Sequence, residues 1–99
     1  MISRQWRGVA HRERGDAYLQ HLRDATFPAL RRLPGFIDAS ILRREVSDGV
    51  EFLIVTRWTS LDAIRTFAGA SVEAAVVPEA VAAMMVDYDR VVRHYEVLA

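Results

Sequence analysis

Apolar side chains recur at helical spacing in the first third of the chain, with arginines and acidic residues between them. The recurring positions are Tyr18, Leu22, Ala25, Ala29 and Leu33. This pattern predicts an amphipathic helix within residues 11–35. Pro28 lies inside the pattern and lacks a backbone N–H group, so the helix should be kinked or split there. The Leu-Pro-Gly sequence at residues 33–35 should end the helix, because proline cannot continue it and glycine favours turn conformations.

The pattern becomes strand-like over the next part of the chain. Residues 36–46 and 50–58 are two strand-forming runs on either side of the turn sequence SDG, which predicts a β-hairpin. One face of the second run carries Val50, Phe52, Ile54, Thr56 and Trp58. The opposite face also carries apolar side chains, at positions 53 and 55. We therefore expect both faces of this strand to be covered.

Shorter patterns predict the remaining elements. Residues 2–10 are typical of a first strand. Thr59 followed by Asp62 resembles the capping start of a second helix, which should end just before Gly69. Pro78 interrupts the alanine- and valine-rich stretch at residues 72–85, so a loop and then a short helical piece are expected there. Residues 88–98 are rich in β-branched and aromatic side chains and predict a last strand.

The expected order of elements is β-α-β-β-α-β, which is the ferredoxin-like arrangement of the α+β class. Residues 1–99 would form a single domain, in which an antiparallel four-stranded sheet has both helices on one face. The other face, with Leu53 and Val55, would be left to solvent unless a second copy of the chain packs against it. A homodimer closed sheet to sheet is the simplest way to cover that face.

The composition excludes several classes of chemistry. The chain is 52% hydrophobic and its formal net charge is zero, so neither disorder nor a nucleic-acid-binding surface is expected. Cysteine is absent, which excludes disulfides, thiolate catalysis and cysteine-based metal sites. Lysine is absent as well, which excludes Schiff-base chemistry and a P-loop. No run is long enough to span a membrane, so we expect a soluble, cytoplasmic protein.

Residues that could bind a metal occur only in pairs. His94 and Glu96 share one face of the predicted last strand, and Asp87 and Asp89 are spaced in the same way. Two ligands are fewer than a stable site requires. We therefore expect no metal site.

Four stretches taken together resemble one protein family. They are AYLQHLRDATFPALRRLPGF (17–36), TRWTSLDAIRTFAG (56–69), VVPEA (76–80) and VRHYEVL (92–98). The chain resembles, over nearly its whole length, the antibiotic-biosynthesis-monooxygenase-like family of dimeric α/β barrels. The resemblance implies a homodimeric ferredoxin-like barrel with a pocket between helices and sheet in each subunit. Characterised members oxidise aromatic polyketide precursors to quinones without metal or flavin, or degrade haem.

The resemblance carries over only part of the quinone-forming pocket. Trp58 occupies the place of a tryptophan that such an oxygenase uses in its pocket. The tyrosine that this enzyme has in the following helix corresponds to Ile64 here. Its pocket asparagine and histidine would fall near Ile54 and Leu42. Most of the polar groups of that pocket are therefore missing.

The haem-degrading members are matched less well. Their tryptophan in the second helix corresponds to Phe67, and their haem-ligating histidine falls near Val77. Both positions are apolar in this chain. Haem degradation is therefore not expected, and the predicted function needs no cofactor.

Six residues are candidates for a site. The candidates for catalysis are Trp58, His94 and His21, and those for substrate contact are Tyr18, Phe67 and Met84. Large aromatic side chains at such positions are more often core than pocket wall. For Trp58, the family resemblance makes the two interpretations about equal, and Tyr18 and Phe67 should line a pocket only if Trp58 does.

The two histidines depend on the direction of their side chains. His94 is the best proton acceptor, because imidazole titrates near neutral pH. If its neighbour Tyr95 points inward, His94 points away, toward a dimer face or solvent. His21 follows Tyr18 at helical spacing, so it either borders the same pocket or is a solvated helix residue.

Several arginines lie on predicted strands, where some must face inward: Arg4, Arg7, Arg57, Arg90 and Arg93. An inward arginine could hold an anionic or carboxylate substrate. Most of them should instead be surface charges paired with acidic residues.

Two functions of different classes remain open. The first is a cofactor-independent monooxygenase that acts on a small aromatic or polyketide-like compound held between Tyr18, Trp58 and Phe67, with His94 or His21 as the base. The second is a non-catalytic homodimeric barrel that binds a small apolar or aromatic ligand or assists a partner enzyme. Isomerases and lyases on the same barrel are a third option. A fold shared by several functions does not choose among them.

Overall fold

A long hairpin and the first strand form the centre of the sheet. In the computed structural model, which describes residues 1–99, strand β2 (Phe36–Val46) pairs antiparallel with β3 (Gly49–Trp58). Strand β1 (Ile2–Ala10) lies antiparallel on the other side of β3. The predicted hairpin and first strand are confirmed. The register places Trp6 opposite Ile54 and Arg4 opposite Thr56, so these side chains share the inner face of the sheet.

Two short strands share the edge beside β1. Strands β4 (Met85–Tyr88) and β5 (Arg93–Glu96) both pair antiparallel with β1, and the sheet has the order β2-β3-β1-β4, with β5 also beside β1. The single last strand predicted over residues 88–98 is therefore wrong in its start and in its continuity.

The interruption of this edge strand has a cause in backbone hydrogen bonding. Between β4 and β5, the N–H of Val92 donates to the carbonyl of Glu73 and the carbonyl of Arg90 accepts from Ala75. Residues 90–92 thus bond to residues 73–75 and not to β1. The predicted α+β, ferredoxin-like arrangement still holds, because the two short strands together occupy the fourth position of an antiparallel sheet.

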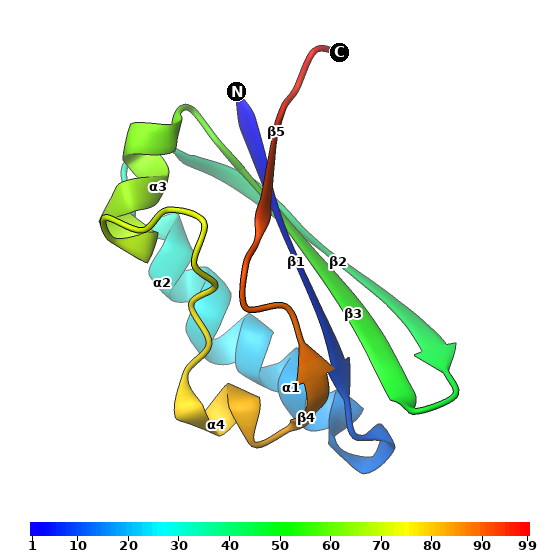
Figure 1. Cartoon of the computed structure of the whole chain (residues 1–99). Helices are drawn as coiled ribbons and strands as arrows, with labels where there is room; N and C mark the ends of the chain where they lie inside the picture. Colours follow the sequence, from blue (N-terminus) through cyan, green and yellow to red (C-terminus); the bar gives the residue numbers. More distant parts are fainter.

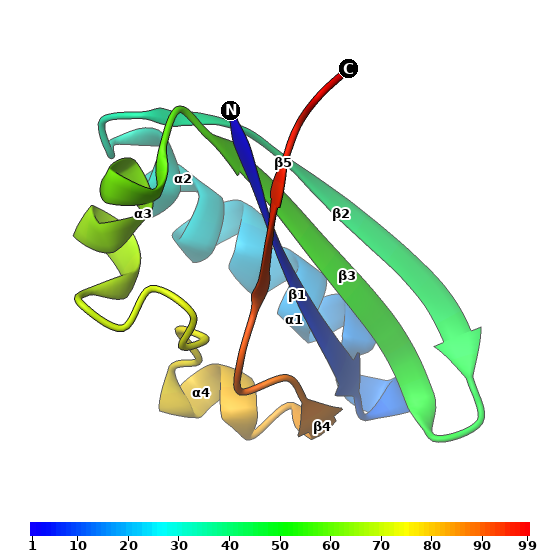
Figure 2. The ribbon, with the colours of Figure 1, turned by 45° about the horizontal axis from the view of Figure 1, so that its top comes forward.

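One helical rod, residues 15–31, lies along the inner face of the sheet (Figure 2). It consists of α1 (Gly15–His21), the π-helix η2 (Leu22–Thr26) and α2 (Phe27–Arg31), and a short 3₁₀ turn, η1 (Arg12–Arg14), precedes it. At the end of the π-helix, the N–H of Phe27 donates to the carbonyl of Leu22, five residues back. Pro28 follows at once, and the wider turn accommodates a residue that has no N–H to donate. The helix was expected to be kinked or split at Pro28; the rod instead continues through Pro28, and the change appears as this π-helical turn just before it.

The remaining helices cover the same face of the sheet (Figure 1). Helix α3 (Leu61–Ala68) begins after Ser60, whose hydroxyl accepts the N–H of Ala63 at 3.1 Å. The predicted cap at Thr59 is one residue too early, because the Ser60 side chain reaches the free N–H group. The helix ends before Gly69, as predicted, and α4 (Glu79–Ala82) is the expected short piece after Pro78.

The hydrophobic core lies between the helices and the inner face of the sheet. Its largest side chains without solvent exposure are Trp58, Phe52 and Ile64. The outer face of the sheet has no helix over it, and Leu42 of that face is half exposed. No helix has both the length and the apolar character that a membrane crossing would need.

Candidate functional site

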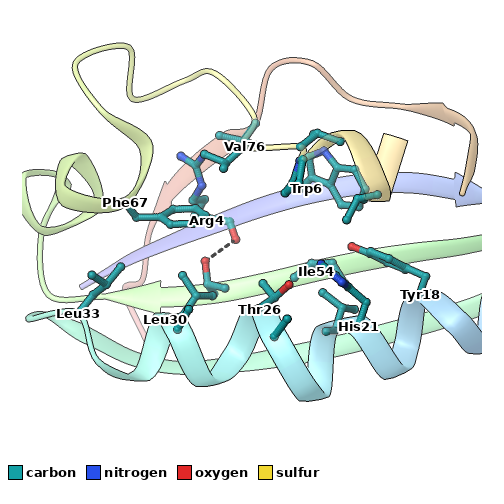
Figure 3. Close-up of a pocket in the computed structure, with 18 of the residues that line it drawn as sticks. Arg4, Trp6, Tyr18, His21, Thr26, Leu30, Leu33, Ile54, Phe67 and Val76 are labelled. Atoms are coloured by element: carbon teal, nitrogen blue, oxygen red, sulfur yellow. Dashed lines mark hydrogen bonds between the residues drawn. The ribbon is translucent and has the colours of Figure 1, made fainter. Parts of the chain in front are cut away.

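A cavity of about 500 Å³ lies between the helical rod and the inner face of the sheet (Figure 3). Most of its wall is apolar. The rod contributes Tyr18, His21, Leu22, Ala25, Thr26, Ala29, Leu30 and the following Leu33. The strands and the residue before β5 contribute Arg4, Trp6, Ile54, Thr56 and Val92, and the other wall consists of Thr66, Phe67, Val76, Val77, Pro78 and Val81. Its volume and lining are those of a site for a small organic ligand.

The mouth of the cavity lies between the rod on one side and α3 with the chain that follows it on the other. Five lining residues are exposed, and they come from these two segments: Ala25, Ala29, Thr66, Val76 and Pro78. All of them are small or lack a long side chain, so little covers the opening. A ligand could enter here without a movement of the sheet.

Tyr18, Trp6 and His21 form one end of the cavity. Tyr18 packs edge-on against Phe52 at a centroid distance of 4.9 Å, and its hydroxyl points into the cavity (Figure 3). Burial raises the pKa of the Tyr18 phenol well above its ordinary value, so the hydroxyl stays protonated and can donate a hydrogen bond. The indole N–H of Trp6 is already used, because it donates to the carbonyl of Asp89 at 2.8 Å.

His21 stands one helical turn after Tyr18, on the same side of the rod. Its ring is half buried and lines the cavity, and no protein hydrogen bond holds either ring nitrogen. Thr26 lines the cavity from the π-helix. The π-helix widens the rod where it faces the sheet, and three of its residues, Leu22, Ala25 and Thr26, line the cavity. Among the residues that line the cavity, His21 is the only histidine.

Arg4 lies at the other end of the cavity, beside Phe67 (Figure 3). Its side chain is almost fully buried, with 5% exposure. The guanidinium lies over the Phe67 ring, 5.6 Å from the ring centroid, and donates to the carbonyls of Val72 and Ala74 at 2.6 and 2.9 Å. Burial lowers the pKa of Arg4 to about 10, an effect that nearby Glu73 partly opposes. The group is still charged at neutral pH.

His94 supports Arg4 from outside the cavity. The register of β5 places His94 opposite Arg4, so it faces inward while Tyr95 faces outward and is half exposed. Its Nε2 lies 3.0 Å from Nη1 of Arg4, and because a guanidinium only donates, the imidazole accepts. Burial and then the charge of Arg4 lower the pKa of His94, while Glu73 opposes the shift. His94 is not part of the cavity wall.

Trp58 and Met84 also lie outside the cavity wall. Trp58 has no solvent exposure, and its ring stacks behind Phe67 at a centroid distance of 6.1 Å. Its indole N–H donates to the hydroxyl of Thr56 at 2.9 Å, inside the core. Met84 packs against the core, and its carbonyl accepts the N–H of His11.

Three of the six candidates therefore meet in the cavity: Tyr18, His21 and Phe67. The inward position of Arg4 was expected for some strand arginines, and its alternation with apolar Ile2 and Trp6 along β1 is the signal that singles it out. Trp6 was not anticipated as a wall of the site. No group of three or more metal-ligating side chains comes together anywhere in the structure.

Comparison with known proteins agrees with this architecture. The sequence profile of the family described as "Antibiotic biosynthesis monooxygenase" matches residues 1–83. No curated protein sequence matches the chain.

Three solved structures show the same fold at low sequence identity. A mutant of MhuD with two manganese protoporphyrin IX molecules in each active site is 18% identical, with a TM-score of 0.70, and the match covers 100% of this chain and 96% of that one. A mutant of SnoaB, a cofactor-independent oxygenase from Streptomyces nogalater, is 18% identical with a TM-score of 0.67 over 99% and 93% of the two chains. The haem degrader MhuD of Mycobacterium tuberculosis, with two haems in its active site, is 18% identical with a TM-score of 0.60 over 98% and 96%.

Proposed function

Because the chain belongs to the antibiotic biosynthesis monooxygenase family, we propose that it is a cofactor-independent monooxygenase that oxidises a small aromatic compound held in the cavity between the helical rod and the sheet. One observation carries this proposal. The cavity of about 500 Å³ combines an apolar wall with one imidazole and one buried phenol at the same end. That combination suits an electron-rich aromatic compound whose proton must be removed in a dry site.

The reaction needs no electron donor beyond the substrate. Oxidation of an anthrone-like CH₂ group by O₂ gives a C=O group and one water, so one oxygen atom enters the product and the other leaves as water. Removal of a proton from the substrate gives a phenolate-type anion, which is electron-rich enough to reduce O₂. The protein must therefore supply a base, stabilise the anion and exclude water.

His21 is the proposed base, because it is the imidazole in the cavity wall and its ring nitrogens have no protein partner. Tyr18 is the proposed donor to the anionic oxygen, since its buried hydroxyl stays protonated. Apolar side chains such as Leu30 and Ile54 keep water away from the ring. Phe67, which lies between Trp58 and the Arg4 guanidinium, adds an aromatic side chain to the wall.

Haem fits these residues poorly. The position that the family resemblance gives to a haem-ligating histidine is near Val77, which contributes only methyl groups to the wall. The one imidazole in the wall, His21, stands at the end shared with Tyr18. We therefore propose no step through haem.

A binding function without catalysis is the second candidate. The observation that favours it is the small number of free polar groups, since Thr56, Thr66 and Trp6 already use theirs within the protein. A binding protein needs only the apolar volume, whereas an oxygenase needs the base as well.

We also propose a homodimer closed through the outer face of the sheet. Leu42 on this face is half exposed, and Leu53 and Val55 beside it are only partly buried. Glu51 accepts hydrogen bonds from Arg7 and Arg44 on the same face, both at 2.7 Å. An apolar strip beside satisfied charges is suitable for a sheet-to-sheet contact.

The test is oxygen uptake with a panel of anthrone-like and other phenolic compounds, with product analysis. The proposal predicts stoichiometric O₂ consumption that His21→Gln reduces by about 10²-fold or more, the usual contribution of a positioned base. His11→Gln is the matched control, because His11 is exposed and lies outside the cavity wall. Ligand binding without O₂ uptake would favour the binding protein, and conversion without O₂ uptake an isomerase or lyase.

A further inference from the structure

Arg4 is a buried cation without a carboxylate partner. The ion pairs of the structure involve seven other arginines, whereas no acidic side chain lies within salt-bridge distance of Arg4, and the nearest carboxylate that influences its pKa, Glu73, makes no hydrogen bond to it. Its protein partners are two backbone carbonyls and the ring of His94, all uncharged acceptors. Buried charges in proteins are normally paired, because an unpaired charge loses its hydration without compensation. The missing partner is therefore a property of the site that needs an explanation.

The donors of Arg4 are only partly used. A guanidinium has five N–H donors. The two N–H groups of Nη1 donate to the carbonyl of Val72 and to Nε2 of His94, and one N–H group of Nη2 donates to the carbonyl of Ala74. The N–H of Nε and the second hydrogen of Nη2 have no acceptor in the protein. Two of the five donors, one on Nε and one on Nη2, are therefore left for an anionic oxygen, and charge-assisted hydrogen bonds of this kind are the strong ones.

The surroundings of Arg4 fix its guanidinium in the wall of the cavity. Phe67 lies under the guanidinium, and both residues are part of the cavity wall. His94 and the carbonyls of residues 72 and 74 hold the group in place before any ligand binds. A fixed donor needs less ordering when the ligand arrives. The outward arginines differ, because Arg7 and Arg57 are paired with Glu51 and Asp38.

We propose that Arg4 binds an anionic oxygen group, most suitably a carboxylate, on the aromatic ligand of this cavity. The inference rests on the proposed function, since it takes the cavity as the ligand site. The carboxylate would lie at the Arg4 end, the ring between Leu30 and Ile54, and a phenolic group at the end formed by Tyr18 and His21 (Figure 3). The substrate class would then be hydroxylated aromatic acids rather than neutral phenols.

A purely structural role for Arg4 makes a different prediction. In that case the guanidinium would only tie residues 72–74 to β1 through the Val72 and Ala74 carbonyls. Its loss would lower stability but would not change the preference between charged and neutral ligands. Ligand preference is therefore the property to measure.

The experiment compares pairs of ligands that differ only in charge, by calorimetric titration at neutral pH. The pairs are the carboxylate and the carboxamide of benzene, naphthalene and anthracene, so that the size of the ring is varied independently. In the natural protein, the best-fitting carboxylate should bind about tenfold more tightly than its carboxamide, or more, as expected for a charge-assisted contact. Arg4→Gln should remove this preference while the carboxamide still binds.

Two further variants separate charge from folding. Arg4→Lys keeps the charge but not the guanidinium, so part of the preference should remain. Arg31→Gln removes an exposed arginine of the rod and should leave the preference unchanged. If Arg4→Gln does not fold, the preference for carboxylate over carboxamide, measured with the natural protein and with Arg4→Lys, still tests the proposal.

The outcomes separate this inference from the proposed function. Equal binding of carboxylate and carboxamide by the natural protein would overturn the role of Arg4 and leave the cavity as a site for neutral aromatics. An unchanged preference in a folded Arg4→Gln variant would overturn it as well. Failure of every compound to bind would overturn both proposals.

Discussion

Trp58 and Phe67 show how two stacked aromatic side chains divide between the core and the cavity. Phe67 is in the cavity wall, while Trp58 behind it is fully buried and lies edge-on against Phe36 at 5.3 Å. The indole N–H finds its acceptor in the hydroxyl of Thr56. Trp58 can therefore influence a ligand only indirectly, through Phe67 and Thr56 of the cavity wall. Its effect on stability should be direct.

Replacement of Thr56 by Val should test this role of Trp58. Valine has nearly the same shape but no hydroxyl, so the buried indole N–H would lose its acceptor. We expect the free energy of unfolding to fall by about 1–3 kcal/mol, the usual cost of an unsatisfied buried donor. Urea unfolding would measure it, with the exposed Thr66→Val as the control. A Thr56→Val protein as stable as the natural one would show that the indole bond contributes nothing.

His94 should make the stability depend on pH. Burial and the charge of Arg4 lower its pKa in the folded protein below the ordinary value of 6.5, so the unfolded chain takes up a proton first as the pH falls. The stability that this group contributes is thus complete above about pH 6.5 and declines below it, by at most about 1.4 kcal/mol per pH unit for one proton.

The measurement is the free energy of unfolding in urea at about pH 7.5 and at about pH 5.5. These two values lie on either side of the ordinary imidazole pKa of about 6.5. His94→Gln keeps an oxygen acceptor for Arg4 but cannot be protonated, so its stability should change less between the two pH values. An equal change in the natural protein and the variant would assign the pH dependence to other groups.

The elements of the fold follow from sequence patterns to different degrees. Val50, Phe52, Ile54 and Trp58 recur with a period of two, which predicts β3 and the side chains of its inner face, although Leu53 and Val55 make the outer face apolar as well. The break between β4 and β5 was not predictable in this way. Val91 and Val92 favour a strand, but long-range bonds to Glu73 and Ala75 override local preference.

The site was less predictable than the fold. The helical period placed Tyr18 and His21 on one side of the rod, and both line the cavity. The same period does not reveal the π-helix that precedes Pro28 and contains Thr26, a residue of the cavity wall. For Arg4, the period of two along β1 indicates the inward direction, but its hydrogen bonds to residues 72 and 74 depend on how distant parts of the chain meet and could not be predicted.

The turn between the rod and β2 depends on Gly35. Its φ is +86°, which residues with a side chain rarely adopt, and a Cβ atom there would lie 2.5 Å from that of Ala63 in α3. The turn and α3 therefore approach each other too closely for any other residue. Gly69 also has a positive φ, +82°, but a Cβ atom there would meet nothing.

Gly35→Ala should consequently lower stability more than Gly69→Ala. Both changes carry the backbone cost of a positive φ, about 1–2 kcal/mol, and only the first adds a clash with α3. Thermal and urea unfolding of the two variants would measure the difference. Equal losses in both would show that α3 moves aside without cost.

At the scale of the whole molecule, the sheet has one covered face and one open face. The cavity and the core occupy the covered face, while Leu42 and Tyr95 of the open face are each half exposed. A chain of 99 residues buries a limited share of its apolar surface, so a second copy would stabilise it. The cavity itself is formed within one chain.

Leu42→Glu should weaken the proposed dimer without unfolding the chain. In a sheet-to-sheet dimer the new carboxylate at position 42 would be buried against the same carboxylate or the apolar side chains of the partner, which is unfavourable. In the free chain it would lie in water. Sedimentation velocity should show a shift from dimer to monomer. Leu61→Glu is the control, because Leu61 is similarly exposed but lies on α3, away from the open face. A monomeric natural protein would contradict the dimer.

The most direct test of the central claim is to locate a bound aromatic compound by nuclear Overhauser contacts in an isotope-labelled sample, with 2-naphthol as the probe and oxygen excluded. The account predicts contacts from the ring protons to the methyl groups of Leu30, Ile54 and Val77, which line the cavity. Contacts to Leu42 and Leu53 on the open face, or to no methyl group at all, would contradict it.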